Sequence, residues 1–205
     1  MKIKVSDYTN FRKLYKFVYA ELKEVDECLY LGEELVKDTE QKYAEGESFI
    51  NIGYNFKNSN SRILSNLYPM EFKFRGKKVK SIEGVLQGIK YKDKKTQNLV
   101  LKYSGLDAYH TRGCNSIDFW GNEQTLYWQG KPIKRDSEQY QLFLNELYVS
   151  ALRNPLYQRA LLATGEKYLL HHIGNPNINE TVLTRYEYEN ILNSLRAFLK
   201  TIQSQ

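Results

Sequence analysis

Cysteine is nearly absent from this chain, with only two, Cys28 and Cys114, in 205 residues. They lie far apart and outside any Cys-x-x-Cys pattern, so the sequence predicts free thiols instead of a disulfide framework. Histidine is also scarce, and the adjacent His171 and His172 would point to opposite faces of a strand. Because no third ligand follows at a suitable spacing, we expect neither a metal site nor a cofactor.

Long hydrophobic runs are missing as well. No apolar run approaches the length of a membrane span, and the N-terminus, MKIKVSDYTNF, lacks the core of a signal peptide. We therefore expect a cytoplasmic protein with no membrane partner. The sequence signatures of a nucleotide-hydrolysing loop and of a serine triad are absent too, which weighs against those two enzyme classes.

The composition is that of an ordinary globular protein, with 41% apolar and 26% charged residues. The length fits one domain with a single core. The net charge is +6, but it is unevenly distributed: residues 23–47 carry nine acids against three lysines, and residues 71–95 carry nine basic residues against three acids. Two solvated surfaces that balance each other are the simpler interpretation. If the substrate is a pyrophosphate or a nucleic acid, the attraction would come from Lys73, Arg75, Lys77, Lys78 and Lys80.

Residues 64–90 have the clearest pattern for chemistry. Ser81 is a plausible N-cap, and a buried helical face is predicted by the spacing of Ile82, Val85, Leu86 and Ile89. A second, polar stripe then consists of Glu83, Gln87 and Lys90. Such a stripe is more often a solvated face than an active site. Gly84 and Gly88 favour the second possibility, because each costs about 1 kcal/mol relative to alanine inside a helix and so predicts a close approach.

The order of motifs in this stretch resembles the NADAR superfamily: LSN-x-YP, an alternating strand, F-x-G, S-x-E and finally Q-x-x-K. The resemblance implies an α+β single domain over residues 1–205, with a small, mostly antiparallel sheet surrounded by helices and residues 1–47 as an N-terminal helical extension. The family cleaves N-glycosidic bonds of ribose phosphate or ADP-ribose, and some members remove ADP-ribose from guanine in nucleic acid. One departure is Gly84, where the family often has histidine.

The resemblance also implies roles for individual residues. Glu83 and Lys90 match the acid and the lysine of the motifs, and Asn66 matches the asparagine of the turn. An ionised Glu83 would stabilise an oxocarbenium-like state. Lys90 would hold phosphate or ribose oxygens, or trap the opened sugar as a Schiff base. Asn66 and Gln87 would orient ribose hydroxyls, and Tyr68 or Trp128 would stack on the base.

A second wall of the pocket is expected from YWQGKPIKRDSEQYQ, which resembles one branch of the family. Its candidates are Trp128, Arg135, Asp136 and Ser137, although Asp136 and Ser137 also fit a simple helix cap. One of the two histidines, His171, is a further candidate to face the pocket.

The rest of the chain is assigned by local pattern. We expect helices over residues 8–23, 137–152, 155–164 and 185–202, strands over residues 48–57, 70–74, 125–128 and 168–173, and loops over residues 58–61, 91–97 and 107–122, the last covering the site. Asn154-Pro155 should break one helix, and Thr184 with Glu187 should form a capping box.

The sequence therefore predicts an N-glycosidase acting on a ribosyl or ADP-ribosyl adduct. Two other possibilities stay open: a non-catalytic module that binds ADP-ribose or NAD, and a basic nucleic-acid-binding protein. The partner would be a free metabolite that contains ADP-ribose or ribose phosphate, ADP-ribosylated DNA or RNA, or a protein adduct.

Overall fold

The structure is a computed structural model that describes residues 46, 48–111 and 120–203. The expected extension over residues 1–47 lies outside the described residues except for position 46. The expected helix at 8–23 and both cysteines also lie outside them.

The helices are α2 (Ser59–Leu64), α3 (Ile82–Gly88), α4 (Lys94–Val100), α5 (Gly105–Thr111), α6 (Trp120–Glu123), α7 (Glu138–Ala151), α8 (Pro155–Ala163) and α9 (Arg185–Gln203). The strands are β1 (Phe49–Asn51), β2 (Phe72–Phe74), β3 (Lys77–Val79), β4 (Thr125–Trp128), β5 (Lys131–Lys134) and β6 (Tyr168–Leu170). This mixture confirms the expected α+β class.

The strands of the described residues form three separate pairs instead of one small sheet. β2–β3 and β4–β5 are antiparallel hairpins, and β1–β6 is a parallel pair. Each hairpin closes through a two-residue turn in which both residues have positive φ, 45° and 78° at Arg75 and Gly76, and 51° and 80° at Gln129 and Gly130. This is the turn whose twist matches that of paired strands.

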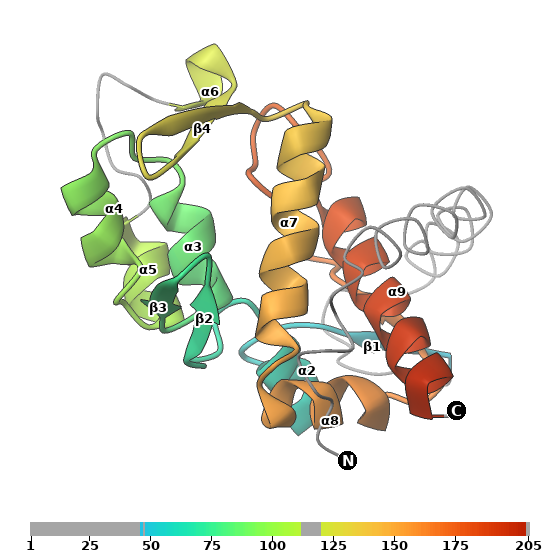
Figure 1. The fold of residues 1–205 in the computed structure, drawn as a ribbon. Coiled ribbons are helices and arrows are strands. Elements are labelled where there is room, and N and C mark those ends of the chain that lie inside the picture. The colour runs from blue at the N-terminus through green and yellow to red at the C-terminus, as the bar shows by residue number, and fades with distance from the viewer. Residues whose placement is uncertain (1–45, 47, 112–119, 204–205) are drawn as a thin grey trace.

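Helix α7 lies at the centre of the molecule (Figure 1). The β2–β3 hairpin and α3 to α5 lie on one side of it, and α9 lies on the other. The buried face of α7 includes Phe143, Leu144 and Leu147, each with no exposed surface. These side chains belong to one hydrophobic core that draws on both sides of the fold, so α7 joins the motif region to the C-terminal helices.

The expected helix ends are confirmed by their caps. The Ser81 hydroxyl accepts from the Gly84 amide at 2.9 Å, and the Ser137 hydroxyl accepts from the Tyr140 amide at 3.2 Å. Thr184 and Glu187 form a reciprocal capping box, with bonds of 3.2 and 2.7 Å. Pro155 begins α8 after the Asn154 cap.

Four local expectations are wrong. The strand at 48–57 ends at Asn51, and the loop at 58–61 is the start of α2, because Asn58 accepts from the Ser61 amide and caps a helix there. The charged run after Lys90 contains α4, which Asp93 caps. The loop at 107–122 is occupied by α5 and α6 at its two ends, while residues 112–119 between them lie outside the description.

Candidate functional site

The polar stripe of α3 is buried. Glu83 and Gln87 expose only 8% and 7% of their surface, which excludes a solvated face for these two side chains. The Gln87 side-chain amide donates to Glu83 Oε1 at 2.6 Å. Burial raises the pKa of Glu83 above its ordinary value, while the hydrogen bond from Gln87 and the positive charge of Lys90 act in the opposite direction. The three members of the stripe therefore influence one another electrostatically.

The amide oxygen of Gln87 is buried and has no hydrogen-bond partner in the described part of the chain. Its amide nitrogen must face the Glu83 carboxylate, which only accepts, so the oxygen is directed elsewhere. A buried acceptor without a partner is unusual in a folded protein. Here it lies in the same side chain that donates to the buried Glu83 carboxylate.

Asn66 is connected to the same helix. The Glu83 backbone amide donates to the Asn66 carbonyl at 3.0 Å, which joins the turn at 65–69 to the first turn of α3. From α7, the Tyr148 hydroxyl donates to Asn66 Oδ1 at 2.7 Å. This bond fixes the orientation of the amide and leaves its nitrogen as the group that can donate to a ligand. Asn66 and Lys90 are half-buried, so the cluster reaches the surface at these two residues.

Two tyrosines hold the chain at this turn and at the residue just before it. Tyr148 lies in α7, and Tyr188, in α9, donates to the Leu64 carbonyl at 2.6 Å. Burial raises the pKa of each phenol well above its usual range, so both stay neutral donors. The sequence analysis missed them as functional residues, because their spacing assigned them to the core. The sequence does hold one indication of their role: a tyrosine predicted to be buried needs a hydrogen-bond partner for its hydroxyl.

Gly84 of α3 and Gly105 of α5 lie at close contacts. A Cβ atom on Gly84 would lie 3.1 Å from the Ser81 hydroxyl and 3.3 Å from the Val100 carbonyl oxygen, at the end of α4. A histidine side chain, which the NADAR resemblance leads one to expect here, would need its neighbours to shift by a few tenths of an ångström. At the start of α5, a Cβ atom on Gly105 would lie 2.0 Å from the Leu67 carbonyl oxygen. Glycine is therefore required where α5 holds the turn that contains Asn66.

Two residues of the expected second wall of the pocket, Trp128 and Arg135, are buried. Trp128 is buried in the core, with its ring 5.0 Å from Phe74 and 5.6 Å from Phe143 in edge-to-face geometry. Arg135 exposes no surface and forms a two-pronged ion pair with Glu187, at 2.9 and 2.6 Å.

The Trp128 ring faces other rings, and the Arg135 guanidinium has the partly buried carboxylate of Glu187 as its partner. Asp136 is exposed, and Ser137 is the residue that caps α7. The elements that face the turn of Asn66 are instead α7 and α9, through Tyr148 and Tyr188.

The remaining candidates have different surroundings. Tyr68 ends the turn at 65–69 and packs half-buried against the core. His171 lies just after β6, with its Nδ1 atom 2.9 Å from the Ile52 carbonyl oxygen and its ring 4.9 Å from the ring of Tyr188 in edge-to-face geometry. Burial lowers the pKa of His171. A neutral His171 thus packs against Tyr188 and supports the cluster indirectly.

Some kinds of site are absent from the described residues. No three histidine, cysteine, aspartate or glutamate side chains gather there in a way that could hold a metal ion. No described helix is long and apolar enough to cross a membrane.

Comparison with known proteins gives two matches. A family model described as bacteriophage protein GP30.3 matches residues 58–197. Among solved structures, the NMR structure of the Escherichia coli protein YbiA is similar with a TM-score of 0.53 and 16% sequence identity, over 83% of this chain and 95% of that chain. At this identity the similarity shows the fold alone, and it confirms the fold that the motif order implied. The search of curated proteins finds no match.

Proposed function

The chain belongs to the family of bacteriophage protein GP30.3 and has the fold of YbiA, and from this premise we propose that it is an N-glycosidase that cleaves the bond between a ribose and a nitrogen atom. One observation carries the proposal. Glu83 is a buried carboxylate held by Gln87, whose amide oxygen is without a partner among the described residues, and the Glu83 backbone is bonded to Asn66. This arrangement combines a negative charge with groups that can hold hydroxyls.

The reaction needs stabilisation of positive charge on the sugar. As the bond between C1 and nitrogen breaks, its electron pair passes to the nitrogen and the ribose becomes oxocarbenium-like. Water then adds to C1, and the proton that water loses balances the charge of the departing nitrogen. An ionised Glu83 opposes the developing positive charge, and its burial strengthens that interaction because little water screens it.

We assign the other polar groups to binding. The Asn66 amide nitrogen and the Gln87 amide oxygen would bind ribose hydroxyls, one as a donor and one as an acceptor. Lys90 favours the ionised form of Glu83 and would hold phosphate or ribose oxygens. The substrate class is a ribosyl or ADP-ribosyl adduct, with ADP-ribose on guanine in nucleic acid as one member.

The test is incubation of the protein with ADP-ribosylated guanine in DNA and, separately, with riboflavin-pathway intermediates, with products identified by mass. Free ADP-ribose or ribose phosphate should be released by the wild type and not by Glu83→Gln. An active Glu83→Gln variant would contradict the role of Glu83. Calorimetric binding of ADP-ribose without product over long incubation would instead support a non-catalytic binding module.

A further inference from the structure

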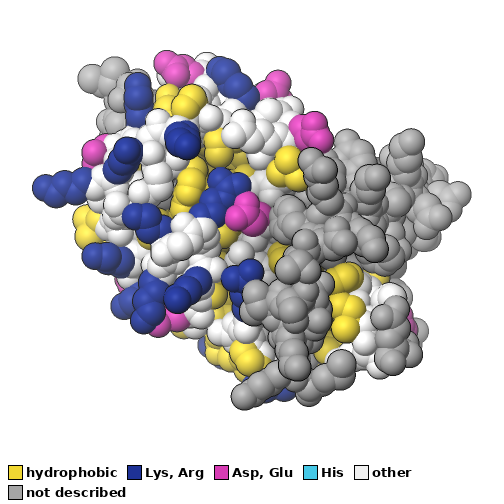
Figure 2. Space-filling model, viewed as in Figure 1, with side chains coloured by type: hydrophobic (Ala, Val, Ile, Leu, Met, Phe, Trp, Pro, Cys, Tyr) yellow, Lys and Arg dark blue, Asp and Glu magenta, His cyan; other side chains and the backbone are white. Residues whose placement is uncertain are grey.

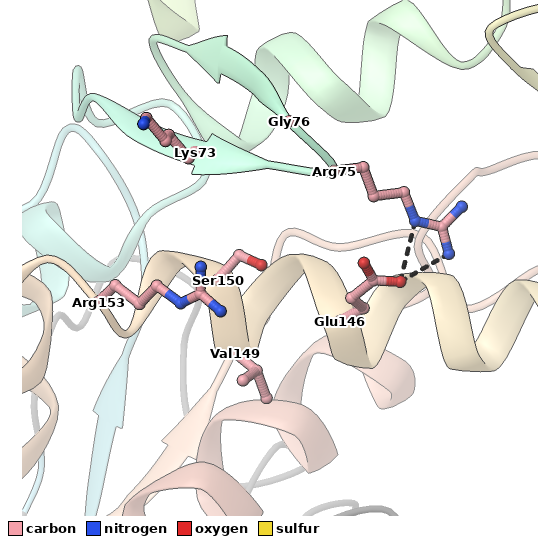
Figure 3. A pocket seen from close by; sticks show the side chains of 7 residues that line it. All are labelled: Lys73, Arg75, Gly76, Glu146, Val149, Ser150 and Arg153. Atoms are coloured by element: carbon pink, nitrogen blue, oxygen red, sulfur yellow. Dashed lines mark hydrogen bonds and ion pairs between the residues drawn. The ribbon is translucent and has the colours of Figure 1, made fainter. Parts of the chain in front are cut away.

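A surface cleft of about 540 Å³ lies between the β2–β3 hairpin and the C-terminal half of α7. Figure 3 shows the residues around it, with Lys73, Arg75 and Gly76 on the hairpin and Glu146, Ser150 and Arg153 on or just after the helix. None of them belongs to the cluster around Glu83.

The cleft is on a different side of α7 from that cluster. Successive residues of an α-helix are rotated by about 100°. Glu146 and Ser150 therefore lie about 160° around the helix from Tyr148, the residue that contacts Asn66. The cleft is a second site, and its properties can be tested without the chemistry of Glu83.

The charge of the cleft is positive. Lys73, Arg75 and Arg153 line it against one carboxylate, that of Glu146. Lys73 and Arg153 are exposed, and neither forms an ion pair with a described residue. Their charges are therefore available to a ligand.

Basic residues continue beyond the cleft along the hairpin, where the exposed or half-buried lysines are Lys77, Lys78 and Lys80. Figure 2 shows lysine and arginine side chains gathered over the part of this face where β2, β3 and α4 lie, with few acidic side chains among them. A basic surface that extends past one cleft suits a chain of phosphates better than a single phosphate.

Arg75 is held in a fixed position. Its Nε and terminal nitrogen donate to Glu146 Oε2 at 2.9 and 2.6 Å, and its guanidinium carbon lies 4.7 Å from the centre of the Phe143 ring. Because these contacts use only part of the guanidinium, other N–H groups remain to donate to an anion. Glu146 thus orients Arg75 while neutralising only one of the three cations.

We propose that this cleft binds the phosphodiester backbone of a nucleic acid. Charge complementarity carries the inference: three cations from two structural elements line one cleft, and further lysines extend from it along the hairpin. The aromatic rings nearby, Phe74 and Phe143, are fully buried and leave no face for base stacking. The contact is therefore to phosphates and independent of base sequence.

The experiment measures binding of fluorescein-labelled single-stranded and duplex DNA by anisotropy, in salt between about 50 and 200 mM. Lys73→Glu and Arg153→Glu should each weaken binding about tenfold or more at low salt. Each should also reduce the slope of log affinity against log salt by about 1. Lys131→Glu is the matched control, because Lys131 is an exposed lysine on β5 and its replacement changes the net charge equally. It should bind within about twofold of the wild type.

Milder variants separate lost attraction from misfolding or added repulsion. Lys73→Gln and Arg153→Gln should show the same loss to a smaller degree, with unchanged melting curves, whereas Glu146→Gln should bind more tightly.

The proposal is overturned if the wild type does not bind at low salt, if Lys131→Glu weakens binding as much as the cleft variants, or if polyglutamate competes as well as DNA. Glu83→Gln should bind DNA like the wild type, so failure of the glycosidase proposal would leave this result intact.

Discussion

The hydroxyl of Tyr148 donates a 2.7 Å hydrogen bond to the side-chain oxygen of Asn66, 82 residues earlier in the chain. The bond joins the central helix α7 to the turn that precedes the β2–β3 hairpin. Because the Asn66 oxygen accepts from Tyr148, the amide nitrogen is the group that can donate to a ligand. A residue of a core helix thus determines which hydrogen-bonding group the turn offers.

Removing that hydroxyl should affect both folding and activity. In Tyr148→Phe the Asn66 oxygen loses its partner, and we expect a loss of about 1 kcal/mol in the free energy of unfolding, measured with urea. We also expect about a tenfold fall in kcat/KM, equivalent to about 1.4 kcal/mol of transition-state stabilisation. Tyr157→Phe is the control, because the buried Tyr157 hydroxyl has no hydrogen-bond partner among the described residues. Equal effects of the two substitutions would contradict the positioning role of Tyr148.

Glu83→Gln should become more stable relative to the wild type as the pH rises. Burial raises the folded-state pKa of Glu83, so the folded protein favours the protonated carboxyl. The contribution of this group to stability is complete below the unfolded pKa and is lost as the pH rises through the folded pKa. The neutral glutamine avoids this loss and can still accept the bond from Gln87.

Thermal melts from mildly acidic to mildly alkaline pH measure the difference between the two proteins. Glu166→Gln serves as the control, because the hydrogen bond and charge of Lys200 lower the pKa of the exposed Glu166. The stability of this variant relative to the wild type should therefore change with pH in the opposite direction. A difference between Glu83→Gln and wild type that does not change with pH would show that Glu83 is not buried as an ionised group.

Lys90 should act through its charge. The positive charge of Lys90 lowers the pKa of Glu83 against the larger effect of burial. Lys90→Met should therefore move the acid limb of the profile of kcat/KM against pH to higher pH, because Glu83 then ionises later. Lys90→Arg keeps the charge and should keep the limb in place. If Lys90→Arg were inactive with an unchanged melting curve, a Schiff base formed by the amine would be the better explanation.

Arg135 should prove structural. Arg135→Met leaves the Glu187 carboxylate buried without its partner, and we expect a loss of about 3–5 kcal/mol. Burial alone would raise the pKa of Glu187, but the hydrogen bonds and charge of Arg135 lower it overall. The pair therefore stabilises the fold above the unfolded pKa of Glu187, and this contribution is lost as the pH falls through the folded pKa.

The deficit of Arg135→Met, measured with urea, should accordingly shrink in acid. The double variant Arg135→Met/Glu187→Gln removes the unpaired charge, and the glutamine can still accept the bond from the Thr184 amide. It should recover most of the stability and show wild-type activity. Loss of activity in a stable double variant would restore Arg135 as a candidate ligand-binding residue.

The sequence by itself determined the features that depend on neighbours in the chain. Ser81, Ser137 and Thr184 cap helices because a cap needs only an amide three residues away. The Arg75-Gly76 turn follows from the same short-range geometry. The pairing of Glu83 with Gln87 also follows from local spacing, because residues four apart share one face of a helix.

Only the tertiary structure decided which side chains meet across the fold. Periodicity marks Tyr148 and Tyr188 as buried, but it does not say that their hydroxyls point toward the turn at 65–69. Likewise, Arg135 follows a basic hairpin in the sequence and yet pairs with Glu187, 52 residues later. Local pattern reports burial and secondary structure, whereas a hydrogen-bond partner is set by how helices pack, and packing depends on the whole core at once.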